Sequence, residues 1–131
     1  YTCTECGRCS SVCPANITGK LLSPRKIMMD TRDRADELGK HIDSKPETMH
    51  DGKSLHEKIS KEELWACTSC NACVEACPVE INPLDIIMQM RQYLVMEEAT
   101  APSEINNMLT NLENNGAPWQ FSAMDRAKWA E

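Results

Sequence analysis

Cysteine is the residue type whose placement carries the most chemistry in this chain. All eight cysteines fall into two copies of one pattern, C-x₂-C-x₂-C-x₃-C-P. They are, in order, Cys3, Cys6, Cys9 and Cys13 in the first copy and Cys67, Cys70, Cys73 and Cys77 in the second. Three cysteines at this spacing can wrap a tight turn around one face of a metal group. The proline favours an extended backbone at the fourth cysteine, which carries that thiolate away from the other three.

This spacing resembles that of the bacterial two-cluster ferredoxins, whose cysteines hold two [4Fe–4S] clusters. The resemblance implies that the fourth cysteine of each copy ligates the other cluster. We therefore expect one cluster on Cys3, Cys6, Cys9 and Cys77, and a second on Cys67, Cys70, Cys73 and Cys13. Four protein thiolates leave no open position for a substrate, so the expected chemistry is transfer of single electrons.

Other uses of the cysteines remain as alternatives. A structural interaction module could hold zinc, but zinc sites pair two short cysteine motifs, often with histidine, and this spacing differs. A disulfide framework suits small secreted domains, and no signal peptide is visible. We expect no catalytic site, because the chain has no evident nucleophile–base pair and no glycine-rich phosphate loop.

Composition supports a small metal-dependent domain. The chain has 131 residues, 5% aromatic residues and a mean hydropathy of −0.48, which predicts a thin apolar core. Metal clusters commonly stabilise such domains. The formal charge is −6, and two clusters with their thiolates bring it to about −10. That charge argues against a nucleic-acid partner and favours a redox partner with a basic surface.

The repeat extends beyond the cysteines. Ser23-Pro24 and Asn82-Pro83 each follow one cysteine run, and both pairs are typical of a helix start. Helices are predicted over 24–39, with Gly39 as the stop, and over 83–98. Residues 1–30 and 65–94 are interpreted as a duplication with pseudo-twofold symmetry around the two cofactors.

The remaining segments predict an all-α fold of the helical ferredoxin type. Residues 40–60 are polar and interrupted by proline and glycine, so a surface loop is expected. Ser60 and Glu63 form a capping-box pattern that predicts a short helix before the second cysteine run. A further helix is predicted over 103–114, followed by a link over 117–131 whose last part is helical. No strand-like alternation occurs.

The chain resembles the helical ferredoxin domain of the heterodisulfide reductase-related Fe–S oxidoreductases. The resemblance is carried by C-T-E-C-G-R-C at 3–9, A-C-T-S-C-N-A-C-V-E-A-C-P at 66–78, I-N-P-L-D-I-I at 81–87 and L-E-N-N-G-A-P-W at 112–119. It implies an electron relay between a flavoprotein donor and a cysteine-rich CCG domain or a quinone-linked acceptor. The CCG motif is not in this sequence, so its chemistry is not expected here.

The ends of the chain lead to further expectations. We expect a domain from a longer cytoplasmic oxidoreductase, itself attached to the inner face of the membrane. No stretch approaches the 18 apolar residues of a transmembrane helix. Four cations near the first cysteine run are candidates for docking a partner: Arg8, Lys20, Arg25 and Lys26. Three aromatic side chains could pack on this domain or form a seam with a following one: Trp119, Phe121 and Trp129.

Overall fold

The computed structural model describes residues 1–130, which form helices joined by turns and contain no β-strand. It divides into two compact units, of which the first is Tyr1–Gln92 and the second begins at Tyr93. All eight cysteines lie in the first unit. The all-α fold predicted from the sequence is confirmed.

Each cysteine run contains short helices that the sequence did not predict. The first run forms α1 (Arg8–Ser11) and α2 (Pro14–Ile17), and the second forms α5 (Ala72–Glu75). Gly7 precedes α1 with a φ of 79°, and Asn71 precedes α5 with a φ of 62°. Both residues follow the second cysteine of their run, and glycine and asparagine are the residues that adopt this left-handed conformation most readily. The duplication is therefore present in the backbone as well as in the sequence.

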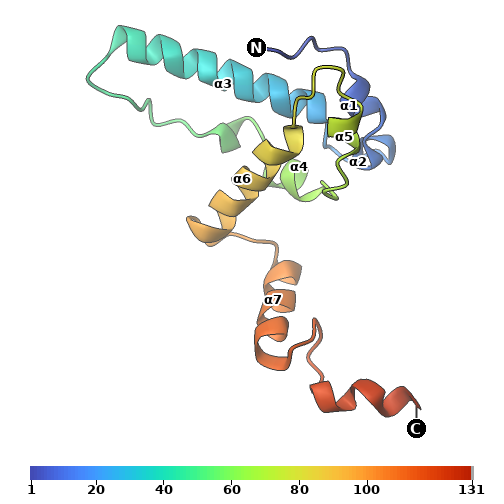
Figure 1. The fold of residues 1–131 in the computed structure, drawn as a ribbon. Coiled ribbons are helices and arrows are strands. Elements are labelled where there is room, and N and C mark those ends of the chain that lie inside the picture. Colours follow the sequence, from blue (N-terminus) through green and yellow to red (C-terminus); the bar gives the residue numbers. More distant parts are fainter. Residues whose placement is uncertain (131) are drawn as a thin grey trace. The chain divides into compact units, whose positions relative to one another are not determined.

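A longer helix follows each run: α3 (Pro24–Ser44) and α6 (Pro83–Met96). Ser23 Oγ accepts a hydrogen bond from the Lys26 amide at 3.4 Å, and Asn82 Oδ1 accepts one from the Asp85 amide at 3.1 Å. These caps satisfy amides that have no partner inside the helix, as predicted. Helices α1, α2 and α5 gather at the N-terminal end of α3 (Figure 1).

The prediction that α3 stops at Gly39 is wrong, because the helix continues to Ser44. The expected loop over 40–60 is correspondingly shorter and contains one 3₁₀ turn, η1 (Leu55–Glu57). This segment is tied back to α3: Arg34 Nη1 donates to Asp51 Oδ2 at 2.8 Å, and Lys58 Nζ donates to Glu37 Oε1 at 2.6 Å. A glycine inside a helix costs only about 1 kcal/mol, which such tertiary contacts can offset.

The short helix α4 (Lys61–Trp65) leads into the second cysteine run. Its capping box is present as predicted: Ser60 Oγ accepts from the Glu63 amide at 3.2 Å, and Glu63 Oε2 accepts from the Ser60 amide at 2.8 Å. The apolar core of the first unit is small, as the composition predicted. Its fully buried aliphatic side chains are Leu22, Ile27, Ile59, Leu64 and Ile87, each worth about 1.5–3 kcal/mol on burial.

The second unit contains α7 (Ser103–Asn115) and the 3₁₀ helix η2 (Ala123–Ala130). Gly116 ends α7 with a φ of 63°, which confirms the predicted stop. The final helix expected after Ser122 is present, in the tighter 3₁₀ form, and residue 131 of the expected link lies outside the described residues. Trp119 is 46% exposed, Phe121 69% and Trp129 89%, so these rings do not form a core within the described residues.

Candidate iron–sulfur site

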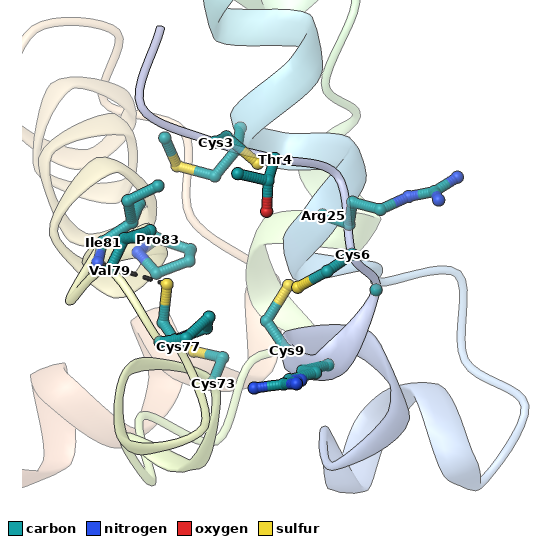
Figure 2. Close-up of a pocket in the computed structure, with 14 residues that line it drawn as sticks. Cys3, Thr4, Cys6, Cys9, Arg25, Cys73, Cys77, Val79, Ile81 and Pro83 are labelled. Atoms are coloured by element: carbon teal, nitrogen blue, oxygen red, sulfur yellow. Dashed lines mark hydrogen bonds between the residues drawn. The ribbon is translucent and has the colours of Figure 1, made fainter.

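Two hollows in the first unit are lined by cysteines. The first hollow contains three cysteines of the first run, Cys3, Cys6 and Cys9, and two of the second run, Cys73 and Cys77. Figure 2 shows Cys6 and Cys9 on one side of this hollow and Cys73 and Cys77 on the other. The side chains that line it are otherwise mostly apolar, including Met28, Val79, Ile81 and Pro83.

The second hollow has the reciprocal composition. It contains Cys67, Cys70 and Cys73 of the second run and Cys13 of the first. Each predicted set of four cysteines therefore lines one hollow, and Cys73 lines both. Cys73 in this double position is the one feature of the arrangement that the spacing did not predict. Within residues 1–130, no three His, Cys, Asp or Glu groups converge as the ligands of a single ion would.

The backbone around the fourth cysteine explains how the runs exchange a side chain. Cys13 is extended, with φ −71° and ψ 118°, and Pro14 then begins α2. Its neighbour Val12 is the last residue of the preceding turn, with φ −100° and ψ −5°. This change of direction turns Cys13 inward, where it is 7% exposed and lines the second hollow. The structural effect expected of the proline is confirmed at this position.

Backbone amides point at several of the sulfur atoms. The Ser69 amide donates to Cys67 Sγ at 3.4 Å, and the Ile81 amide donates to Cys77 Sγ at 3.3 Å. The Arg8 amide is the largest cause of the lowered pKa of the Cys6 thiol. The Ala72 amide has the same effect on the pKa of Cys70. These donors stabilise negative charge on sulfur, as cluster-binding loops require.

Other thiols are held in the opposite direction. Burial raises the pKa of Cys9, and it raises the pKa of Cys73 to about 11, with the neighbouring Cys67 and Cys13 adding to the shift. At neutral pH such a thiol becomes a thiolate only beside a strong positive charge. Iron supplies that charge, and its binding releases the proton. The partly buried thiols and the inward-pointing amides therefore fit an iron–sulfur cluster in each hollow.

Comparison with known proteins identifies the family. Residues 2–81 match the family model described as a 4Fe-4S dicluster domain, and these residues include both cysteine runs. The chain belongs to this dicluster family. Its cofactors are two [4Fe–4S] clusters, and its function is electron transfer. The zinc-binding alternative is thereby set aside.

Relatives of this dicluster domain are parts of larger redox proteins. The chain is 30% identical over 161 residues to the probable iron-sulfur-binding oxidoreductase FadF of Bacillus subtilis, covering 100% of the chain and 23% of that protein. It is 34% identical over 142 residues to a probable membrane-anchored ferredoxin of Chromohalobacter salexigens, covering 98% and 21%. A protein of Archaeoglobus profundus that is named for its likeness to a heterodisulfide reductase component is 26% identical over 126 residues, covering 96% and 57%.

The four cations that the sequence suggested for docking differ in their surroundings. Lys26 Nζ contacts Asp30 at 2.7 Å and Glu63 at 2.9 Å, so it is engaged within the domain. Arg8 and Arg25 border the first hollow. The Arg25 guanidinium points away from the sulfur atoms (Figure 2). No helix within residues 1–130 combines the length and apolar composition needed to cross a membrane.

Proposed function

We propose that this dicluster domain relays single electrons through two clusters held by crossed cysteine sets, inside a larger Fe–S oxidoreductase. One set is Cys3, Cys6, Cys9 and Cys77, and the other is Cys67, Cys70, Cys73 and Cys13. The observation that carries the proposal is that each hollow draws cysteines from both runs. A [4Fe–4S] cluster supplies a site that gains and loses one electron without bond chemistry.

The exposure of the cysteines suggests where electrons enter and leave. Cys6 and Cys70 are exposed, whereas Cys13 and Cys73 are buried. Each hollow therefore has one cysteine at its solvent edge, and Cys73 lies between the two hollows. In the relay we propose, one external partner docks near Cys6 and the other near Cys70, and the electron crosses the domain past Cys73.

The partners are proposed from the relatives. The chain spans 23% of the length of FadF and 21% of the membrane-anchored ferredoxin, and a third relative is named EtfAB:quinone oxidoreductase. These names support a flavoprotein donor and a quinone-linked acceptor, or a cysteine-rich CCG domain as acceptor. Residues 117–131 would form the link toward that further domain. Cluster thiolates need a reducing compartment, which supports a cytoplasmic parent protein attached to the inner face of the membrane.

Metal and sulfide analysis tests the proposal. Protein reconstituted without oxygen should contain about eight iron and about eight sulfide per chain. Its broad visible absorbance should bleach with dithionite, and titration should require two electrons per chain. A preparation with about four iron per chain would contradict the paired sites. A folded, colourless protein that holds zinc would overturn the electron-transfer role.

A further inference from the structure

Two arginines occupy the same place in the two halves of the repeat. Arg32 lies eight residues after Pro24, and Arg91 lies eight residues after Pro83. Each prolyl residue begins the helix that follows one cysteine run, so the arginines lie two turns into α3 and α6. Both side chains reach back to the cysteine run of their own half, but they contact different groups there.

Arg91 holds the backbone that enters the second cysteine run. Its Nε and Nη2 donate to the Leu64 carbonyl at 3.0 and 2.5 Å, and Nη2 also donates to the Cys67 carbonyl at 2.6 Å. The guanidinium carbon lies 4.8 Å from the centroid of the Trp65 ring. The Leu64 carbonyl lies at the C-terminal end of α4, where carbonyls lack partners inside the helix. A planar guanidinium can make these contacts together, and a lysine ammonium cannot.

Arg32 holds the first cysteine run through a carboxylate. Its Nη1 lies 2.7 Å from Glu5 Oε1. Glu5 stands between Cys3 and Cys6 with a φ of 57°, and the residue at the same place in the second run, Ser69, has a φ of 56°. A left-handed conformation at a residue with a side chain costs about 1 kcal/mol or more. The contact with α3 therefore bears on a turn that the local sequence does not favour.

We propose that Arg32 and Arg91 are positioning residues, one for each cluster. Each fixes the first turn of a cysteine run against the helix that follows that run, so that Cys3 or Cys67 is in place before the cluster binds. This inference rests on the proposed crossed relay. The two arginines differ in charge balance: Glu5 offsets Arg32, whereas Arg91 makes no ion pair with any carboxylate of residues 1–130. Arg91 therefore also favours the reduced, more negative state of the cluster beside it.

The second arginine is tested with Arg91→Gln and Arg91→Lys in the cluster-loaded protein. The measurements are the midpoint potential of each EPR signal and the half-life of the visible absorbance in a chelator. Arg91→Gln should lower the midpoint of one signal only and shorten the half-life several-fold. Arg91→Lys should keep the midpoint near that of the unmodified protein but lose the cluster as fast as Arg91→Gln. Arg126→Gln, at an exposed arginine of η2, is the charge-matched control and should change neither measurement.

The first arginine gives an independent arm. Arg32→Gln leaves the Glu5 carboxylate unpaired, so the midpoint of the other EPR signal should fall. Adding Glu5→Gln should restore that midpoint, because the charge is balanced again, while the half-life stays short. Wild-type midpoints and half-lives in both Arg91→Gln and Arg32→Gln would overturn the inference, as would a change in the same signal for both. Failure of the unmodified protein to bind iron would instead overturn the proposed relay.

Discussion

Lys26 Nζ lies 2.9 Å from Glu63 Oε1, and this ion pair joins the helix after the first cysteine run to the helix before the second. The Glu63 side chain is 8% exposed and that of Lys26 is 44% exposed. Burial alone would raise the pKa of Glu63, but hydrogen bonds from Lys26 and Ser60 outweigh it and the pKa is lowered. Burial likewise opposes the raised pKa of Lys26, which results from Asp30 and Glu63. The two halves of the repeat are thus held together by charge as well as by the shared hollows.

Glu63→Gln should destabilise the cluster-loaded protein by about 1–2 kcal/mol, less than for a fully buried pair because Lys26 is partly exposed. A lowered carboxylate pKa contributes stability above the ordinary value of 4.5, and a raised lysine pKa contributes it below 10.5. The difference between Glu63→Gln and the unmodified protein should therefore be full between these values and shrink as the pH falls below 4.5. Anaerobic urea denaturation measures it. Glu62→Gln, on the exposed side of the same helix, should cost much less, and an equal cost would contradict the ion-pair account.

Cys13→Ser should damage the cluster bound by the second cysteine run, although Cys13 belongs to the first run. Cys77→Ser should damage the other cluster, since the two fourth cysteines cross between the hollows. EPR of the dithionite-reduced variants distinguishes the two signals, and each variant should lose about half of the iron. If both substitutions removed the same signal, or if each affected its own run, the crossed assignment would be wrong.

Gly7→Asn should be tolerated, and Gly7→Val should not. Gly7 has a φ of 79°, and its counterpart Asn71 adopts the same left-handed conformation with a side chain. A Cβ built on Gly7 meets no atom within 4 Å, so the cost is in the backbone alone. A β-branched residue there should cost about 1–2 kcal/mol and lower the iron content, as measured after reconstitution. Equal iron contents for the two variants would show that the backbone conformation at this position is unimportant.

Removal of the clusters should unfold much of the first unit. Its buried aliphatic core consists of few side chains, and domains of this kind commonly gain their folding free energy from metal binding. Chelation under anaerobic conditions should reduce the far-ultraviolet circular dichroism of the helices, and reconstitution should restore it. Retention of the full helical signal after complete loss of iron would contradict this dependence.

The sequence predicted those parts of the molecule that depend on local rules. The cysteine spacing, the caps at Ser23 and Asn82 and the capping box at Ser60 each involve residues a few positions apart, and all are present. The helix stop at Gly39 failed because distant residues, Asp51 and Lys58, hold the following segment along α3.

The candidate site shows the same division. Which cysteines share a hollow could be predicted by resemblance to known cluster proteins. That Cys73 lines both hollows could not, because it depends on how α5 packs against α1. Arg91 was also missed, since its partners are backbone carbonyls that leave no mark in the sequence. The equal spacing of Arg32 and Arg91 from their prolines was the available signal.

The exchange of cysteines between hollows has a consequence for biosynthesis. When the ribosome has completed residue 60, the first run has all its cysteines but the wall of each hollow that Cys73 provides has not yet been translated. Neither hollow is complete until about residue 77 has emerged. An iron–sulfur assembly factor that loads this domain therefore has to act late in synthesis, and it meets two sites that are completed by the same stretch of nascent chain.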